Sequence, residues 1–227
     1  PELLDWLAAE IAERGWSLKA LHRLILTSAS YRQSSTLKSE ALRQDSDNRL
    51  LWRKSPTRLE AEALRDAILQ VSGQWNRSMR GPGYYDFTTY VHNTQFYTMI
   101  DPVGPSFNRR SLYRTWVRSA RSPFLDAFDC PDPSVTAPKR AQTTTPLQSL
   151  SLMNSAFVLR MADHFADRVQ AQAGNATRPQ VKRAFALVYG REPDANELAD
   201  SARLVERHGL AALCRVLFNS NEFLYVY

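Results

Sequence analysis

The stretch TTTPLQSLSLMNSAFVLRMADHFADRV, residues 143–169, decides the fold. Thr145 is a helix N-cap, Pro146 suits the first helical position, and Gln148 is the third residue of a capping box. Apolar side chains then recur every three or four residues as far as Val169. Since this spacing keeps them on one face, the stretch predicts a central helix of about six turns.

Helix signals continue on both sides of this stretch. Gly15 is a C-terminal cap, Ser17 is an N-cap, and Ser55-Pro56 places a proline directly after a cap. Asp194 and Glu197 form another capping box. These signals predict helices over residues 2–14, 17–34, 56–72, 180–189, 194–208 and 210–224, with an irregular segment at 36–54 and a polar linker at 171–179.

Residues 74–145 differ in character. Gly81-Pro82-Gly83 interrupts the chain, and aromatic residues crowd the segment 84–97, which favours short strands. An imperfect alternation predicts a further strand over residues 110–118, and a short helix follows at 123–128. Residues 129–145 contain three prolines, so no regular structure is expected there. A loop of this length is either functional or disordered.

The pattern as a whole predicts a mainly α fold: a multi-helix bundle with a small β or irregular, aromatic-rich insert. We divide it into an N-terminal helical part, residues 1–73, the insert and proline-rich loop, residues 74–145, and a C-terminal helical bundle, residues 146–227. These parts are expected to form one integrated domain. Because the chain opens inside an amphipathic pattern, we expect it to be a fragment of a larger protein.

Composition limits the possible functions. The chain has 227 residues, 44% of them apolar, and a net charge of +6, which are values of a folded domain with a real core. No window is long and apolar enough to predict a membrane span. Lysine and arginine form no dense block, which argues against nucleic acid as a partner. No serine-hydrolase elbow, phosphate-binding loop or paired-histidine motif is present.

The two cysteines, Cys130 and Cys214, are too few for a disulfide scaffold or a zinc site. We therefore expect no metal site and no cofactor in this chain, and no haem is attached to it because the C-x-x-C-H motif is absent. Cys214 lies on an apolar helix face and is predicted to be a buried free thiol. Cys130 precedes a proline in the loop and is expected to be the more exposed of the two.

Five ordered motifs along the chain resemble a known family. They are Asn108-Arg109-Arg110-Ser111-Leu112-Tyr113-Arg114, Asp129-Cys130-Pro131-Asp132-Pro133-Ser134, Thr143-Thr144-Thr145-Pro146-Leu147-Gln148 with Leu152-Met153-Asn154, Tyr189-Gly190-Arg191-Glu192-Pro193, and Asn219-Ser220-Asn221-Glu222-Phe223. In this order they resemble the C-terminal domain of unknown function of large planctomycete and verrucomicrobial proteins that carry a cytochrome-c-like module. The resemblance implies an exported protein, periplasmic or at the cell surface, with haem c possible in an upstream module. It assigns no catalytic residue.

The proline-rich loop and the start of the central helix form the main candidate site. Free N–H groups at a helix start favour anions, and guanidinium groups and hydroxyls add donors. This combination predicts a site for a carboxylate, sulfate or phosphate, built from Arg109, Arg110, Arg114, Arg140, Thr143, Thr144, Gln148 and Asn154. The alternative is structural: Thr145 only caps the helix, and the arginines pair with Asp129, Asp132, Glu60 or Glu62 to hold the loop.

Secondary candidates are Glu62, Arg65, His92, Asp129 and Asp132. Glu62 and Asp66 lie four residues apart on one helix face, where burial of Glu62 would raise its pKa as an acid catalyst requires. The alternative is a salt bridge from Glu62 to Arg58 or Arg65. His92 lies in the aromatic segment and either faces a ligand or is merely packed or solvated.

Three functions fit these observations, and whether the chain is an enzyme is left open. The first is a non-catalytic accessory domain of a large exported, cytochrome-c-linked protein, which docks on its upstream domains or on a partner. The second is binding or processing of a polysaccharide, anionic or sulfated, through the Arg/Thr loop and exposed aromatics. The aromatics could instead form a strand layer over the core. Nucleic-acid binding rests on net charge alone and is the weakest of the three.

Overall fold

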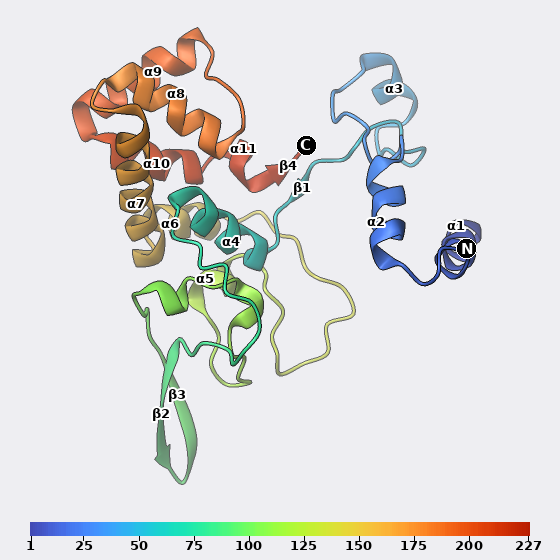
Figure 1. Cartoon of the computed structure of the whole chain (residues 1–227), viewed down its shortest axis with the longest axis horizontal. Helices are drawn as coiled ribbons and strands as arrows, with labels where there is room; N and C mark the ends of the chain where they lie inside the picture. The colour runs from blue at the N-terminus through green and yellow to red at the C-terminus, as the bar shows by residue number, and fades with distance from the viewer. The chain divides into compact units, whose positions relative to one another are not determined.

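In a computed structural model that describes residues 1–227, eleven α-helices dominate and the strands form only two two-stranded sheets (Figure 1). The predicted mainly α fold is therefore confirmed. By its internal contacts the chain separates into a first unit, residues 1–57 with Tyr227, and a second unit, residues 58–226. No helix is both long enough and apolar enough to cross a membrane.

The first unit contains three helices, α1 (Glu2–Glu13), α2 (Leu18–Thr27) and α3 (Ser39–Gln44). The predicted cap of α2 is confirmed, because the Ser17 hydroxyl accepts a hydrogen bond from the Ala20 N–H at 3.3 Å. Helix α2 ends earlier than predicted. The hydroxyls of Thr27 and Ser28 donate to backbone carbonyls of the preceding turn, and such bonds compete with the helix ladder. Helix α3 lies in a segment that was predicted to be irregular.

The second unit contains all the remaining elements. Its helices are α4 (Ala61–Ser72), α5 (Pro123–Ala127), α6 (Pro146–Asn154), α7 (Ala156–Ala173), α8 (Thr177–Val188), α9 (Ala195–His208), α10 (Leu210–Phe218) and α11 (Asn221–Leu224). The 3-10 helices are η1 (Pro105–Phe107) and η2 (Ser111–Tyr113). The strands are β2 (Phe87–His92), β3 (Thr94–Met99), β4 (Tyr225–Val226) and β1 (Thr57–Arg58), which begins at the last residue of the first unit.

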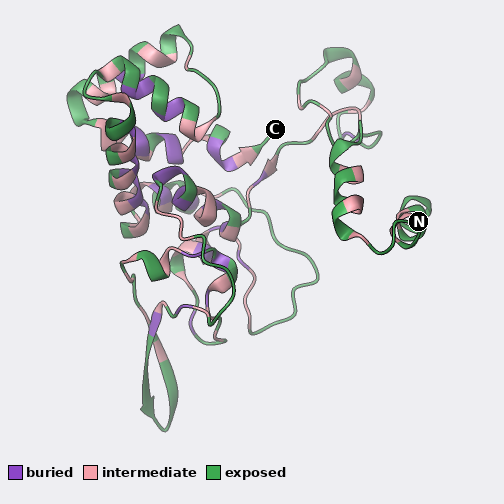
Figure 2. Cartoon of the chain, viewed as in Figure 1, coloured by how far each residue is buried: buried purple, intermediate pink, exposed green.

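The hydrophobic core lies where α4, α7 and α10 meet, and buried residues, purple in Figure 2, occur along these helices. Ile68 of α4, Phe165 of α7 and Phe218 of α10 are completely buried. The rings of Phe165 and Phe218 are stacked with their centroids 5.5 Å apart. Helices α8 and α9 pack beside this centre, and Asp194 caps α9 with the predicted capping box.

The predicted six-turn helix is wrong in one respect: Ser155 interrupts it. Ser155 has extended backbone angles, φ −61° and ψ 129°, so it ends α6 and begins α7. The bend changes which side chains of α6 are covered. Leu152 is completely buried, whereas Leu147 and Leu150, which belonged to the predicted apolar stripe, are exposed. We infer that burial of Leu152 stabilises the bent arrangement of α6 and α7 more than one continuous straight helix would be stabilised.

The last predicted helix is also divided. Helix α10 ends at Phe218, and the Ser220 side chain accepts the Phe223 N–H to cap α11. The predicted helix over 56–72 begins only at Ala61, because the chain before it is extended and the Leu59 N–H donates to the Leu224 carbonyl at 2.8 Å. The linker predicted at 171–179 is shorter, since α7 continues to Ala173 and α8 starts at Thr177.

The aromatic segment forms an antiparallel hairpin, in which Tyr90 is paired with Phe96 and Phe87 with Met99. Short strands were predicted there and are confirmed. The strand predicted over residues 110–118 is wrong, because Ser111 turns into η2. Its N–H and its hydroxyl both donate to the Asp66 carboxylate, at 2.7 and 3.0 Å, which replaces strand hydrogen bonds.

Candidate functional site

Asp129 fixes the beginning of the proline-rich loop, residues 129–145. Its carboxylate accepts hydrogen bonds from Arg58 at 2.5 Å and from the N–H and hydroxyl of Thr143, both at 2.8 Å. Partial burial raises the pKa of Asp129, but the Thr143 hydrogen bonds and the Arg58 charge outweigh it, so the pKa lies below its ordinary value. The two ends of the loop are thereby joined.

Gln148 holds the other end of the loop from inside α6. Its side-chain oxygen accepts the Thr145 N–H at 3.3 Å, which is the capping-box contact predicted from the sequence. Its amide nitrogen donates to the carbonyl and the hydroxyl of Thr143. Thr144 lies beside these groups, and its hydroxyl is 3.3 Å from the Tyr225 hydroxyl. Three of the predicted ligand-binding groups, Thr143, Thr144 and Gln148, thus make contacts within the protein.

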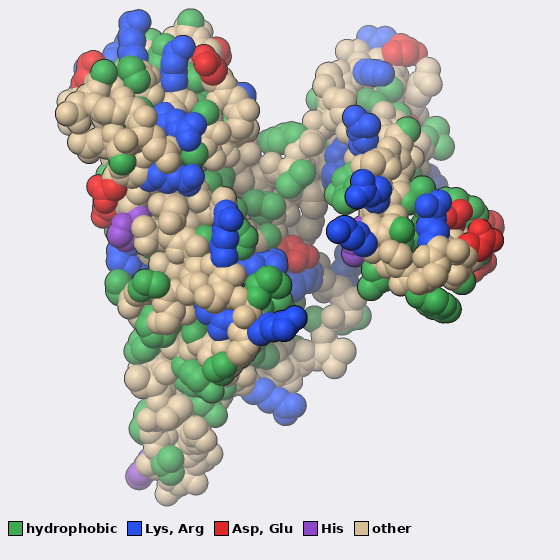
Figure 3. Space-filling view, viewed as in Figure 1, with side chains coloured by type: hydrophobic (Ala, Val, Ile, Leu, Met, Phe, Trp, Pro, Cys, Tyr) green, Lys and Arg blue, Asp and Glu red, His purple; other side chains and the backbone are tan.

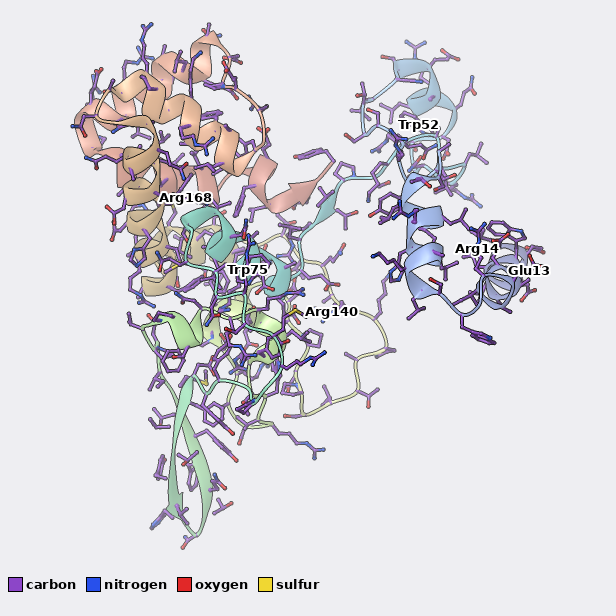
Figure 4. All side chains as sticks on the ribbon, viewed as in Figure 1. Glu13, Arg14, Trp52, Trp75, Arg140 and Arg168 are labelled. Atoms are coloured by element: carbon purple, nitrogen blue, oxygen red, sulfur yellow. The ribbon has the colours of Figure 1, made fainter.

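Arg140, in the middle of the loop, lies beside the start of α4 (Figure 4) and forms a two-pronged ion pair with Glu62, at 2.8 and 3.0 Å. Glu60 is a further 3.4 Å contact of the same guanidinium. This is the pairing that the structural alternative predicts for the loop. Neither Arg58 nor Arg65 pairs with Glu62: Arg58 contacts Asp129, and Arg65 donates to the carbonyls of residues 107 and 109.

The surroundings of Glu62 differ from those considered above for an acid catalyst. Burial raises the pKa of Glu62, but the hydrogen bonds and the positive charge of Arg140 outweigh this effect. The net pKa is below the ordinary value. Cys130 lies next to it and donates its S–H to Glu62 at 3.6 Å. Cys130 is buried, although it is the more exposed of the two cysteines, at 5% against 0% for Cys214. Burial and the Glu62 charge raise the pKa of the Cys130 thiol to about 12. Near neutral pH, Glu62 is therefore ionised and Cys130 keeps its proton.

The other three predicted arginines have separate partners. Arg110 contacts Asp66 at 3.2 Å, and Arg109 donates to the carbonyls of Arg80 and Pro82 at 2.6 and 2.7 Å. Arg114 is buried and donates to Asp86 at 2.7 Å. The structure therefore does not gather the four guanidinium groups into one cluster, as an anion site at the loop would require.

The remaining candidates are equally dispersed. The Asn154 side chain donates to the Leu150 carbonyl within α6. Asp132 accepts the Ser134 N–H and lies 3.4 Å from Arg121. These donors keep the pKa of Asp132 below its ordinary value. His92 is exposed at the end of β2. None of these three side chains contacts Arg140.

An open groove of about 710 Å³ contains the predicted residues that do lie together. Its ionisable lining consists of Glu60, Glu62, Asp66, Asp132, Arg110 and Arg140, so carboxylates outnumber guanidinium groups. The sequence did not show this excess of carboxylates, because Asp66 of α4 and Glu60 just before α4 are far from the loop along the chain. It also missed Arg58 as the partner of Asp129. Arg58 and Asp129 are 71 positions apart, so no local sequence pattern indicates that they pair.

The chain is thus a helical domain in which the charged residues of the groove pair with one another, Arg140 with Glu62 and Arg110 with Asp66. This chain belongs to the PSD1 family, proteins of unknown function (DUF1553), and the family model matches residues 1–205. No curated protein and no solved structure matches the chain.

Proposed function

We propose that this chain is a non-catalytic accessory domain of a larger exported protein, and that helices α1 and α2 dock on the domain that precedes it in that polypeptide. The observation that carries the proposal is the absence of a core in the first unit. Of residues 1–57, only Asn48 is buried. Large apolar side chains of α1, α2 and the turn between them are exposed instead: Leu3, Leu4, Trp6, Trp16, Leu18 and Leu26.

Exposed apolar side chains that follow helical spacing favour a partner surface. In α2 the apolar residues share one face, yet none of them is buried. On the face shown in Figure 3, apolar side chains and lysine and arginine are both uncovered over each unit. We therefore infer an apolar partner from the exposed apolar residues of α1, α2 and the turn between them.

The state of the groove supports a role without catalysis. Glu62 is ionised and bound to Arg140, and Cys130 keeps its proton. A general acid or a nucleophile needs the opposite states near neutral pH. The resemblance of the five motifs supports the setting: an exported, periplasmic or surface protein with a cytochrome-like upstream module and its haem c.

Hydrogen exchange tests the docking. We expect the amides of α1 and α2 to exchange quickly in the isolated chain and slowly in the longer natural protein. Leu18→Ser in the longer protein should restore fast exchange. Leu112→Ser is the matched control, since Leu112 is also an exposed leucine but lies in the second unit. Equal exchange of α1 and α2 in both proteins would contradict docking.

A second candidate, contact with a glycan, is favoured by the outer face of the hairpin. The rings of Tyr90 and Phe96 are stacked, 5.1 Å apart and 14° from parallel, and both are exposed. Exposed aromatic pairs of this kind can stack on sugar rings. We expect Tyr90→Ala to reduce co-sedimentation with an insoluble acidic polysaccharide such as pectate, whereas Tyr31→Ala, another exposed tyrosine, should not.

A further inference from the structure

A cavity of about 340 Å³ lies in the second unit, at the base of the β2–β3 hairpin and away from the groove that contains Arg140. Its lining comes from the hairpin base, the starts of α5 and α7, and α4. The residues that matter for the argument are Arg65, Tyr84, Asp86, Arg114, Phe124 and Phe157. The volume is in the range of small-molecule sites.

Three buried polar atoms of this lining have no hydrogen-bond partner. Arg114 exposes only 1% of its side chain, and its Nε donates to Asp86 Oδ2 at 2.7 Å. Its Nη1, the Oδ1 of Asp86 and the hydroxyl of Tyr84 are all unpaired. Buried polar groups in proteins are normally satisfied, so three in one cavity wall require an explanation.

The unpaired atoms specify the chemistry of a ligand. Arg114 Nη1 needs an acceptor, Asp86 Oδ1 needs a donor, and the Tyr84 hydroxyl can serve as either. Burial raises the pKa of Tyr84, so its proton is retained at neutral pH. A simple anion would satisfy Arg114 and be repelled by Asp86, and a simple cation would do the reverse. A hydroxyl group both donates and accepts, and so it matches all three.

The charges and the aromatic rings of the lining also favour a neutral ligand that carries hydroxyl groups. Arg65 and Arg114 are balanced by Asp86 and Asp101, so the lining has no net formal charge. Arg65 is already occupied by the Phe107 carbonyl at 2.7 Å and lies 5.5 Å from the Tyr84 ring and 5.3 Å from the Phe157 ring. Arg65 thus covers part of the Tyr84 and Phe157 rings, and Phe124, whose ring is 5.5 Å from that of Phe157, adds aromatic surface of the kind that suits the C–H face of a sugar ring.

We propose that this cavity binds one neutral saccharide ring, whose hydroxyl groups bridge Arg114, Asp86 and Tyr84 while its apolar face lies against Phe124 and Phe157. The three unpaired atoms are closed to solvent in the structure. Contact with these atoms therefore requires that the lining segment 99–102 move outward. Arg160 holds Asp101 of that segment at 2.5 and 2.6 Å, so we expect this ion pair to slow entry of the ring.

Saturation-transfer NMR with the full chain tests the proposal. The probes are glucose, galactose, mannose and xylose, with glucuronate and inorganic sulfate as charged comparators. We expect transfer to at least one neutral sugar, and affinity reduced about tenfold by Tyr84→Phe, the loss of one hydrogen bond. This variant is expected to fold, since the hydroxyl it removes has no partner. Tyr85→Phe, at an exposed neighbour outside the cavity, should bind normally.

Other outcomes overturn the proposal. They are no transfer to any neutral sugar at millimolar concentration, stronger binding of glucuronate or sulfate than of every neutral sugar, and unchanged affinity in Tyr84→Phe. An Asp101→Asn variant supplies an independent check, because a weakened tie to Arg160 should speed association without removing a ligand contact. The result does not depend on the docking of α1 and α2, which hydrogen exchange measures separately.

Discussion

At Asp129 a single carboxylate joins three segments of the second unit: the end of α5, the extended chain at Arg58 and the end of the proline-rich loop at Thr143. Asp129 also has a positive φ of 62°, a conformation that aspartate and asparagine tolerate better than most residues. Asp129→Asn therefore removes the charge while leaving the backbone preference in place.

We expect Asp129→Asn to lower the free energy of unfolding by about 2 kcal/mol at neutral pH, the contribution of a charged hydrogen-bonded pair. The folded pKa of Asp129 is below its unfolded value, so this contribution is present above the unfolded pKa and is lost as pH falls through the folded pKa. Urea titrations of the wild-type chain and the variant at about pH 7 and about pH 2 measure this contribution to the free energy of unfolding. Asp167→Asn, at an exposed position, is the control. An equal loss at both pH values would contradict the assignment.

The raised thiol pKa of Cys130 leads to a second prediction at this scale. In the folded chain neither Cys130 nor the buried Cys214 should react with iodoacetamide at neutral pH, because the thiolate is the reactive form. Glu62→Gln removes the negative charge that raises the Cys130 pKa, so alkylation of Cys130 should accelerate. Mass spectrometry of the modified peptides measures this. Cys214, which has no contact with Glu62, is the internal control, and equal acceleration at both cysteines would indicate general unfolding.

Long-range residue pairs of this kind could not be singled out from the sequence. The capping contact between Thr145 and Gln148 is local and was predicted correctly. The bond between Arg140 and Glu62 spans 78 positions, and Glu62 was only one of four carboxylates considered as its partner. The predicted anion site depended on where four arginines would lie, and only the tertiary fold places them.

At the scale of elements, local sequence signals located most helices and several of their first residues, but not the breaks within the long predicted helices. The caps at Ser17, Thr145 and Asp194 depend on side chains a few residues away, so they are visible in the sequence. The breaks at Ser155 and Ser220 depend on what the flanking helices pack against. An apolar stripe is compatible with one helix or with two, and burial of Leu152 favours two.

Gly83 allows two backbone segments, at Tyr84 and at Arg114, to approach each other closely. A Cβ there would lie 2.7 Å from both the Tyr113 carbonyl and the Thr115 hydroxyl, where the backbone of Tyr84 pairs with Arg114. We expect Gly83→Ala to destabilise the second unit by about 2 kcal/mol, as overpacking does. Gly81→Ala is the comparison: its φ of 75° adds strain, but no atom lies within 4 Å. Urea unfolding of both variants, with sugar binding as a second measurement, separates close approach from backbone strain.

At the scale of the whole molecule, the two units differ in what stabilises them. Every residue of the buried hydrophobic cluster belongs to the second unit, from Ala61 to Leu224. The first unit is held by local polar contacts. The Asp45 carboxylate accepts the N–H groups of Arg49 and Leu50, and the Trp52 indole donates to the Asp45 carbonyl. A unit of this kind gains stability only when its apolar faces are covered.

Removal of residues 1–54 should therefore leave the main unfolding transition almost unchanged. Because the core is intact, we expect the urea midpoint of the truncated chain, followed by far-UV circular dichroism, to match that of the whole chain. The first unit should melt in a separate, shallow phase that disappears on truncation. In the larger protein proposed above, where α1 and α2 would be covered, the same truncation should be strongly destabilising. A large shift of the midpoint in the isolated chain would show that the first unit contributes to the core, and the docking proposal would lose its basis.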